Sequence, residues 1–499
     1  MEAHGPAHNK LSLIAIKLPK IRYNQKKKDT KDITMKKPVL LIPVENQVRE
    51  LDAKLLLACV AAKRGFTSIV GPKRKIENHI ASFPRGIFLS KSLRIVKRRF
   101  FPISRLLGHE IVAWDEEALV HLPAETYFSR RLSPVGMENV SHLFAWGEDN
   151  AELWRQYPQL PAGIPIHITG NPRVDLLRPD MQGYYKPEAD HIHKTYGNFI
   201  LINTNYNHVN ACYPTQNLYQ PVEKPGEKDR YGQPARGMSR ENAEGFRDHK
   251  QAVFEDFQKL IPKLDLAFPD QTIVVRPHPT ENQDVYHEIA ARCQKVRVTN
   301  EGNVVPWLMA ARVLVHNGCT TGVEAFVMRV PAISYRQTIN DFYDDGFYRL
   351  PNRLSHQCFS FEELQTTLSQ ILGGELSAAE GEKRKVLLDH FLAAQDGPLA
   401  CERMVDILDR VADNMHRAPK PAPKKWLVGW YQATRRRVRK TYKAYLPGSF
   451  KSVAFERHRY PGITPGELEE RIARFQQVLG EDAQLQLRQI RDKIFKISR

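Results

Sequence analysis

Three polar segments, each following a short run of apolar and β-branched residues, carry side chains suited to chemistry on an anionic substrate. In RPHPTEN (276–282), Arg276 and His278 stand two residues apart in a loop that two prolines stiffen. A guanidinium and an imidazole presented together can hold a phosphate or a carboxylate. The alternative is an ordinary solvated loop in which His278 only caps nearby backbone groups.

The second segment, HNGCTTGVEAF (316–326), places a glycine turn and two threonines ahead of a run of good helix formers. Backbone N–H groups at such a helix start, together with the threonine hydroxyls, form an anion site for a diphosphate or a nucleotide monophosphate. A glutamate one turn into the helix can accept hydrogen bonds from ribose hydroxyls. The alternative is a threonine that serves only as an N-cap. The residues of this predicted site are Asn317, Gly318, Thr320, Thr321 and Glu324.

The third segment, AWDEEAL (113–119), carries the consecutive acids Asp115, Glu116 and Glu117 after an apolar strand. Acid–base or nucleophilic work at an anomeric carbon requires a carboxylate, which this run can supply. Neighbouring side chains of an extended segment project to opposite sides, so only one or two of the three acids can reach a substrate. The alternative is a solvated acidic run.

Two further groups of polar residues follow predicted strands and face the same predicted cleft. They are Glu45, Asn46 and Arg49 in the opening loop, and Asn203 and Asn205 in NTNYNHVN. The first group lies where an acceptor would bind. The asparagines can hydrogen-bond substrate hydroxyls, unless they only form turns. Asp175 in GNPRVDLL is either a second carboxylate or an N-cap.

Parallel sheets covered by helices must position these segments, because apolar β-branched runs alternate with helix-length amphipathic stretches. The loops that bind ligands in such sheets lie at the carboxyl ends of the strands. The strands expected in the first half cover 39–44, 67–71, 87–90, 109–117 and 166–170, with helices over 50–65 and 150–158. Those of the second half cover 199–205, 272–279, 295–300, 312–318 and 331–336, with helices over 363–372 and 377–415, the latter broken near Gly397 and Pro398.

The fold class predicted from this pattern is α/β, with two Rossmann-like domains facing a cleft, because 499 residues are too many for one ordinary core. A long polar stretch inside the second domain, 210–243, is either a functional lid or disorder. The expected parts are a disordered or misannotated extension (1–34), the two domains (35–195 and 196–415), a proline-rich linker (416–425) and a basic amphipathic helical tail (426–499).

The formal net charge of +18 is concentrated in two segments. Residues 1–37 carry ten Lys and Arg against three acids, and residues 417–443 carry ten against none. Because no nucleic-acid-binding module accompanies these residues, we expect no nucleic acid as a partner. Six scattered cysteines fit a reducing cytoplasm rather than a disulfide framework or a zinc site. No apolar run approaches the roughly 18 residues that span a bilayer, and no signal-peptide pattern appears.

The segment 426–446 joins Trp426, Leu427, Trp430 and Tyr431 to a dense cluster of arginine and lysine. A basic helix with aromatic anchors lies well on an anionic bilayer surface. We therefore expect peripheral binding to the inner face of the cytoplasmic membrane. A solvated or partner-packed helix is the alternative.

The WDEE, RPHP, HNG-x-T-T-G-x-E-A and GNPRVDLL motifs together resemble the bacterial surface carbohydrate biosynthesis proteins. That family is similar to the GT-B-fold Kdo transferases of capsule and O-antigen assembly and, more distantly, to bacterial sialyltransferases. The resemblance spans roughly 38–415 and includes HRYPGITPGELEERI (458–472). It implies a GT-B-like fold, Glu116 or Asp115 as the catalytic carboxylate, and a CMP-activated donor. The residues implied for its phosphate are Arg276, His278, Thr320 and Thr321, with Glu324 near the ribose.

The expected activity is transfer of a sugar, Kdo or a related ulosonic acid, from the nucleotide-activated donor to a glycan or lipid-linked acceptor. No G-x-G-x-x-G, P-loop or D-x-D motif stands out, which argues against a dehydrogenase, a kinase or metal-dependent transfer. We expect no metal and no cofactor, with catalytic His278 stabilising the leaving phosphate. Two alternatives stay open: a transferase of a polyol phosphate such as CDP-glycerol, and a catalytically inert scaffold recruited to the membrane.

Overall fold

The computed structural model describes residues 36–499 apart from 95–98, 122, 221–229, 236, 345–348, 446–451 and 482–483. The expectation for residues 1–34 and part of the expected lid stretch (210–243) therefore lie outside the described residues. Residues 37–499 belong to one compact unit.

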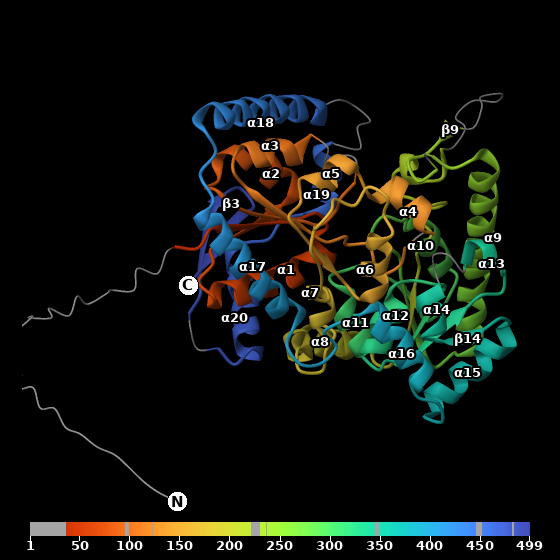
Figure 1. The fold of residues 1–499 in the computed structure, drawn as a ribbon. Coiled ribbons are helices and arrows are strands. Elements are labelled where there is room, and N and C mark those ends of the chain that lie inside the picture. Colours follow the sequence, from red (N-terminus) through yellow and green to blue (C-terminus); the bar gives the residue numbers. More distant parts are fainter. Residues whose placement is uncertain are drawn as a thin grey trace, which may run out of the picture. The chain divides into compact units, whose positions relative to one another are not determined.

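The first half is built on six parallel strands in the order β2-β1-β3-β4-β5-β6 (Figure 1). Their short, continuous apolar runs suit strands that helices cover on both faces. In the register, Leu40 of β1 pairs with Ser68 of β2, and the pairing continues to Val44 with Pro72. The strands are β1 (Val39–Val44), β2 (Ser68–Pro72), β3 (Gly86–Ser90), β4 (Glu110–Ala113), β5 (His142–Ala145) and β6 (Ile166–Ile168).

Alternate side chains of β1 enter separate cores on the two faces of this sheet. Leu40 and Ile42 belong to the core formed with α1, whereas Leu41 belongs to the core formed with α2 and α3. The helices of this half are α1 (Gln47–Lys63), α2 (Lys73–Asn78), α3 (Phe100–Leu106), α4 (Ala124–Arg131), α5 (Pro134–Glu138), α6 (Glu148–Arg155) and α7 (Pro172–Asp175), with a 3-10 turn, η1 (Ile80–Ser82).

The second half contains a six-stranded parallel sheet in the order β11-β10-β7-β12-β13-β14. Its strands are β7 (Phe199–Asn203), β10 (Thr272–Arg276), β11 (Val296–Val298), β12 (Val313–His316), β13 (Ala332–Tyr335) and β14 (His356–Cys358), and a separate hairpin pairs β8 (Tyr219–Gln220) with β9 (Arg230–Tyr231). Its helices are α8 (Lys186–Tyr196), α9 (Arg240–Ala267), α10 (Asp284–Ala290), α11 (Val304–Ala310), α12 (Thr321–Val327), α13 (Asp341–Asp344), α14 (Arg349–Arg353), α15 (Phe361–Gly373), α16 (Glu382–Phe391) and α17 (Ala400–Arg417).

Two helices, α8 and α17, pack against the half to which the expected domain bounds do not assign them. α8 lies before the expected domain start at 196 but packs against α11 of the second half, while α17 returns to pack on α1 and α7. Asp175 fixes this return, because its carboxylate accepts the N–H groups of Ala400 (2.7 Å) and Cys401 (2.9 Å) at the start of α17. Asp175 thus caps α17 from a distant part of the chain, whereas the predicted alternative was an N-cap of the segment that directly follows it.

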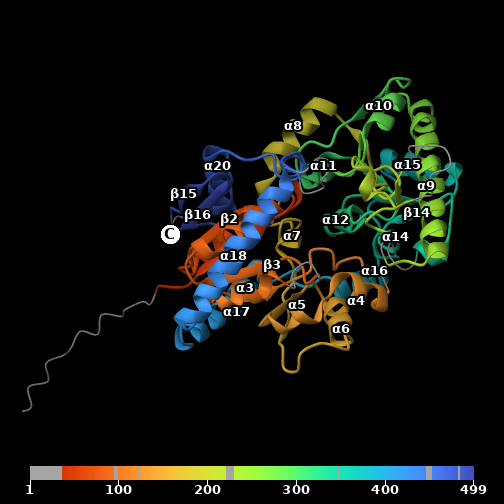
Figure 2. The same cartoon turned by 90° about the horizontal axis from the view of Figure 1, so that it is seen from above.

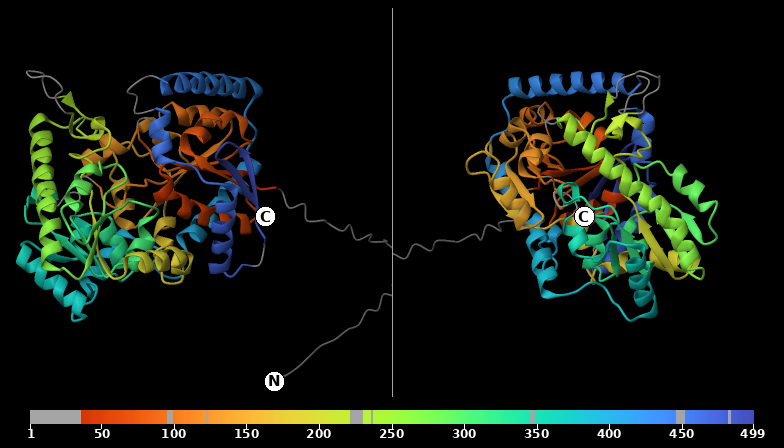
Figure 3. Two further views of the ribbon diagram at one scale, coloured as in Figure 1. Left: turned by 180° about the vertical axis from the view of Figure 1, so that it is seen from behind. Right: turned by 90° about the vertical axis from the view of Figure 1, so that its right-hand side faces the viewer.

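The C-terminal segment consists of α18 (Pro423–Ala444), α19 (Val453–Arg459), α20 (Pro465–Val478) and the hairpin β15 (Gln486–Arg491) and β16 (Ile494–Ser498). Figure 3 shows this hairpin, in dark blue, close to the C-terminus. β16 pairs antiparallel with β2, so the hairpin extends the first sheet to eight strands. The predicted α/β fold with two Rossmann-like halves and a helical C-terminal part is confirmed. The helical tail contains, in addition, a hairpin that was not predicted.

Candidate active site

The strand orders define one topological switch point in each sheet, between β1 and β3 and between β7 and β12. Ligands of open parallel sheets bind at the carboxyl ends of the strands at such points. At the first switch point the chain continues into Glu45 and Lys91, and at the second into Thr204 and Asn317. Both switch points therefore lead into polar residues.

The three acids after β4 have different surroundings. The Asp115 carboxylate is buried and accepts hydrogen bonds from Arg131 Nε (2.9 Å) and from the hydroxyl of Tyr127 (2.9 Å), with a second contact to the Arg131 guanidinium. Glu116 is also buried and accepts the indole N–H of Trp114 at 2.6 Å. Asp115, predicted as a possible catalytic acid, is thus committed to holding α4 against the sheet.

Glu117 is the accessible member of the run, with 44% of its side chain exposed. Arg49 forms a bidentate ion pair with Glu117: Nη1 lies 2.8 Å from Oε1, and Nη2 lies 3.3 Å from Oε2. Burial raises the pKa of Glu117, but Arg49, Arg131 and Lys91 outweigh burial and bring the pKa to about 2. The carboxylate is therefore ionised at any working pH.

His278 lies in a loop that a buried glutamate organises. Glu281 accepts the backbone N–H of His278 (3.0 Å) and the hydroxyls of Thr204 (2.8 Å) and Tyr286 (2.5 Å). The Nδ1 atom of His278 lies 2.8 Å from the hydroxyl of Thr280 and accepts the backbone N–H of the same residue at 3.3 Å, which places the proton of the neutral ring on Nε2. Burial, and then Arg49, lower the pKa of His278 to about 4. The imidazole is a neutral Nε2–H donor.

Arg276, predicted to bind a phosphate, is engaged by the backbone of a neighbouring loop. Its guanidinium donates to the backbone carbonyls of Glu301 (3.0 Å) and Gly302 (2.6 Å) and lies 5.5 Å from the ring centre of Trp307. Both bonds tie the strand end to the loop after β11, so the side chain supports this loop.

The turn after β12 is packed tightly against the sheet. A Cβ atom at Gly322 would lie 2.5 Å from His316 Nε2, so only glycine fits there. His316 donates Nε2–H to Ser355 Oγ at 2.9 Å, since that hydroxyl itself donates to Pro351. Gly318 has a positive φ of 70°, which suits the turn. Thr320 occupies the N-cap position of α12 without a side-chain capping bond, and buried Thr321 begins the helix.

Several buried polar atoms at this second switch point have no hydrogen-bond partner among the described residues. They include Asn203 Oδ1, His316 Nδ1 and Glu324 Oε2. Asn203 is 4% exposed, and Asn205, two residues on, is half-buried. Buried polar atoms without partners are rare in native proteins and are commonly explained by an absent ligand or water. This cluster is consistent with a polar ligand bound here.

The remaining oxygen of Glu324 connects the two halves. Arg173, at the start of α7, donates to Glu324 Oε1 at 2.8 Å and lies 5.7 Å from the ring centre of Trp146. Glu324 also acts electrostatically on Arg49. Burial lowers the pKa of Arg49, but the negative charges of Glu117, Glu116 and Glu324 together raise this pKa above its ordinary value. Arg49 and Glu117 of the first half thus share one charged region with His278 and Glu324 of the second.

The opening loop contributes a separate charged cluster. Glu45 pairs with Lys73 (3.0 Å), Lys91 (3.1 Å) and Arg459 (2.8 Å). Burial raises its pKa, and these cations more than reverse the effect, so that the carboxylate is ionised. Asn46 occupies the N-cap position of α1 without a side-chain capping bond.

The sequence predicted most of these residues but missed Lys91, Arg173 and Glu281. Lys91 directly follows the strand GIFLS, and Arg173 lies in the quoted GNPRVDLL turn, so both had a usable positional signal. Glu281 stands in RPHPTEN itself, where its role as the hub of the loop depends on contacts with Thr204 and Tyr286. In the described part of the chain, no group of three or more His, Cys, Asp or Glu could hold a metal ion.

The basic segment of the C-terminal part forms α18, which packs on α3, α2 and η1. Figure 2 shows α18 lying across α3. Its inward stripe is formed by Gly429, Ala433, Arg436, Lys440 and Ala444. A Cβ atom at Gly429 would lie 2.9 Å from Leu106 Cβ of α3, so the two helices touch closely. The expected segment ends at Leu446, which lies outside the described residues. Among those described, no helix is long and apolar enough to cross a bilayer.

Two of the α18 cations serve the fold. Arg436 donates to the Glu77 carboxylate at 2.7 Å and lies over the ring of Phe100, and Lys440 contacts the same carboxylate at 3.2 Å. The opposite face of α18 carries an outward stripe of apolar and aromatic residues, which lie four, seven, four and three positions apart along the chain. Its members are Leu427, Tyr431, Val438, Tyr442 and Tyr445, all exposed, with Arg435, Arg437, Arg439 and Lys443 exposed around them.

No protein-family model and no curated protein matches the chain. Similar solved structures include the wall teichoic acid polymerase TagF, which is 10% identical with a TM-score of 0.47, over 78% of this chain and 92% of that one. UDP-GlcNAc 2-epimerase from Methanocaldococcus jannaschii, in complex with UDP-GlcNAc and UDP, is 12% identical with a TM-score of 0.45, over 74% and 99%. The Neisseria meningitidis epimerase bound to UDP-GlcNAc is 10% identical with a TM-score of 0.43, over 75% and 99%. Similarity at this level leaves the function to be inferred from the residues of this chain.

Proposed function

We propose that this protein is a glycosyltransferase of surface polysaccharide assembly that uses a nucleotide-activated sugar donor. The observation that carries the proposal is that a ligand site in the second half and a charged pair of residues from the first half lie in the same region. The buried polar atoms without partners at the second switch point supply a ligand site. The ionised Glu117 carboxylate and its partner Arg49 share the charged region of His278 and Glu324 beside it.

The donor would bind at the second switch point. Glu324 Oε2 and Asn203 Oδ1 can accept hydrogen bonds from ribose or sugar hydroxyls, since neither has a partner among the described residues. The turn of Asn317, Gly318, Thr320 and Thr321 would receive the phosphate. His278 would donate Nε2–H to the leaving phosphate oxygen, and a fixed donor of this kind stabilises charge that develops in the transition state.

The carboxylate that acts at the sugar would be Glu117, with Glu116 directly beside it. A carboxylate with a pKa of about 2 is a weak proton acceptor, so its main contribution would be to stabilise positive charge at the anomeric carbon. Arg49 would orient it. For the sugar itself we propose Kdo or a related ulosonic acid carried by CMP, and the arginines Arg49 and Arg173 would complement the carboxylate of such a sugar.

Binding of nucleotide monophosphates tests the donor class. CMP should raise the melting temperature of the protein more than UMP, AMP or GMP, because a ligand that binds only the native state stabilises it. Donor hydrolysis with CMP-, CDP- and UDP-linked compounds then separates the reactions. Turnover of CMP-Kdo that His278→Ala lowers by about one to two orders of magnitude supports the proposal. Turnover of CDP-glycerol alone indicates a polyol phosphate transferase, and nucleotide binding without any turnover indicates an inert scaffold.

We further propose that the acceptor is a glycan or a lipid-linked glycan and that α18 holds the enzyme at the inner face of the cytoplasmic membrane. Support comes from the exposed apolar and aromatic stripe of α18, with exposed cations on either side and no acid between residues 417 and 443. Such a helix lies in the bilayer interface with its apolar stripe inward. The bound enzyme would meet a lipid-linked acceptor at a raised effective concentration.

A further inference from the structure

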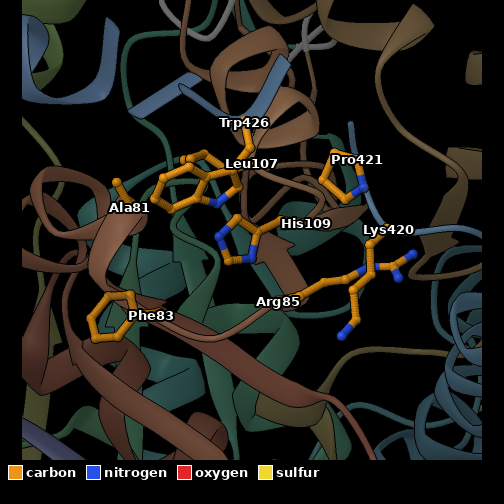
Figure 4. A pocket seen from close by; sticks show the side chains of 8 residues that line it. All are labelled: Ala81, Phe83, Arg85, Leu107, His109, Lys420, Pro421 and Trp426. Carbon is orange, nitrogen blue, oxygen red and sulfur yellow. The ribbon is translucent and has the colours of Figure 1, made fainter. Parts of the chain in front are cut away.

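A cavity of about 330 Å³ lies between the first half and the start of α18. Its lining comes from three places: the edge of the first half, the proline-rich linker and the first turn of α18 (Figure 4). The lining residues are Ala81, Phe83, Arg85, Leu107, His109, Lys420, Pro421 and Trp426. Ligand pockets begin at about this volume.

The cavity lies at the opposite edge of the sheet from the proposed active site. Arg85 directly precedes β3 and His109 directly precedes β4, so both stand at the amino ends of their strands. The residues of the proposed active site all follow the carboxyl ends of strands. The cavity therefore belongs to a separate site.

Its walls differ in chemistry. In Figure 4 the side chains of Arg85 and Lys420 lie together on one side, whereas Ala81, Phe83 and the indole of Trp426 lie on the other. Arg85 is held in place by hydrogen bonds to the carbonyls of Gly108 (3.1 Å) and Ala418 (3.3 Å). Neither bond neutralises its charge. Among the described residues, neither Arg85 nor Lys420 has an acidic partner.

The third polar lining residue, His109, is neutral. Gly86 donates its N–H to Nδ1 at 3.3 Å, so Nε2 carries the proton and points to the carbonyl of Ile80 at 3.2 Å. Burial lowers the pKa of His109 to about 4, although the hydrogen bond to the carbonyl of Ile80 opposes this effect. The cavity thus offers one positive charge held in place, that of Arg85, and a second from exposed Lys420 beside an apolar wall, which suits an anionic amphiphile.

The linker is packed in place and does not act as a free tether. A Cβ atom at Gly108 would lie 2.9 Å from the ring of Pro421, so the linker lies directly on the first half. Trp426 also stands one residue before Leu427, the first member of the outward stripe of α18. The cavity is therefore beside the surface that we assign to the membrane.

We propose that this cavity binds the phosphate-bearing headgroup of an anionic lipid. The phosphate would lie between Arg85 and Lys420, and the first carbons of the lipid would pack on Phe83, Leu107 and Trp426. The site rests on the membrane contact proposed for α18, because a bilayer lipid can reach it only if that helix lies at the surface. It is independent of the chemistry at His278.

Calorimetric titration of the full chain with monomeric dihexanoyl phosphatidylglycerol, below its critical micelle concentration, tests the site without a bilayer. We expect saturable binding that weakens about tenfold in Lys420→Gln, which removes one charge-assisted contact. Lys420 is exposed and makes no hydrogen bond or ion pair within the described residues, so this variant should fold normally. Arg85→Gln should weaken binding equally. Lys443→Gln makes the same charge change at the far end of α18 and should bind like the parent.

Three further titrations identify the ligand class. Dihexanoyl phosphatidylcholine, which has no net charge, should not bind, and inorganic phosphate should bind about tenfold more weakly because it lacks apolar contacts. Absence of saturable phosphatidylglycerol binding, or equal weakening in Lys443→Gln, overturns the proposal. Phosphate binding as tight as that of the lipid would make this a site for free phosphate and overturn the lipid assignment. Vesicle binding by α18 and donor turnover are measured separately, so failure here is distinguishable from failure of the proposed function.

Discussion

Three consecutive acids, Asp115, Glu116 and Glu117, illustrate how the same residue type takes three roles within one segment. Asp115 holds α4 through Arg131, Glu116 binds the indole of Trp114, and only Glu117 is accessible beside Arg49. The sequence predicted an extended segment with neighbours on opposite sides, but β4 ends at Ala113 and a turn follows, in which the N–H of Ala118 bonds the carbonyl of Asp115 at 3.2 Å. Which side faces the ligand depends on Arg131 and Arg49, whose positions relative to the acids only the folded chain defines.

Substitution of these acids should separate catalysis from stability. Glu117→Gln should lower kcat by about a hundredfold or more with little change in KM for the donor, because its charge acts chiefly in the transition state. Asp115→Asn should instead lower the free energy of unfolding by about 3 kcal/mol, since it leaves the Arg131 charge without its buried partner. Steady-state kinetics and urea denaturation measure the two effects. A kinetic loss confined to Glu116→Gln would move the catalytic role to that residue.

The RPHP loop allows a similar separation. His278→Ala should weaken use of the donor by one to two orders of magnitude, about 1.5–3 kcal/mol, because a hydrogen bond to a charged phosphate is lost. Arg276→Ala should mainly lower the melting temperature, since its guanidinium binds the carbonyls of Glu301 and Gly302. Kinetics and thermal unfolding of both variants check this. Normal stability with impaired donor use in Arg276→Ala would restore the predicted role in phosphate binding.

Glu281 should make stability depend on pH in a definite direction. Burial raises its pKa to about 7, whereas the unfolded carboxyl titrates near its ordinary value of about 4.3. Between these values the native carboxyl keeps a proton that the unfolded chain releases, so its contribution to stability falls as pH rises. Glu281→Gln removes this contribution. The stability of the variant relative to the parent should therefore improve from pH 5 to pH 8.

Urea denaturation across that pH range measures the effect. Glu288→Gln, an exposed glutamate on α10, makes the matched charge change and should show no comparable trend. A difference between Glu281→Gln and the parent that stays constant with pH would mean that burial does not raise the pKa of this carboxyl.

At the level of elements, the long apolar runs were predictable and the short strands were not. VLLIPV and TIVVR form buried strands close to their predicted bounds, because a continuous β-branched run fits a sheet covered on both faces. β5 (HLFA) and β14 (HQC) were missed, since four and three residues are too few for a periodic signal. The hairpin of β15 and β16 was missed as well, since the apolar residues of QLRQIR stand three positions apart instead of alternating.

The α18 cations divide into two classes that vesicle binding can distinguish. Replacing Arg435, Arg437 and Arg439 by Gln should weaken binding to anionic vesicles about a hundredfold, at about 1 kcal/mol for each cation near the surface. Binding of the parent should fall with ionic strength and be small on neutral vesicles. A pelleting assay measures both. The matched double variant of Arg436 and Lys440, which contact Glu77, should keep most of its membrane binding but unfold more easily. Equal pelleting of the triple variant and the parent would contradict the membrane contact.

For the whole molecule, the sequence predicted which residue types meet in the candidate site but not their partners. Arg49 meets Glu117 across 68 positions of the chain, and Arg173 meets Glu324 across 151. The first pairing depends on which strand ends lie together in one sheet, and the second depends on how the two sheets meet. Nothing local in GNPRVDLL or HNGCTTG specifies the second pairing. The positions of the segments at strand ends were predictable because the topology of a parallel sheet fixes that edge.

The pairing of β16 with β2 gives the order of protein synthesis a physical consequence. Phe495 of β16 pairs with Val70 of β2. At a synthesis rate of about 5–20 residues per second, β16 is made roughly 20 to 85 seconds after β2, and the edge of β2 is unpaired until then. During that interval an unpaired strand edge can recruit another chain. Nascent chains stopped before residue 485 should therefore aggregate or bind chaperones more than the full-length protein, which sedimentation of translation products would reveal. Equal solubility of both would show that the first half completes its folding without the last strand.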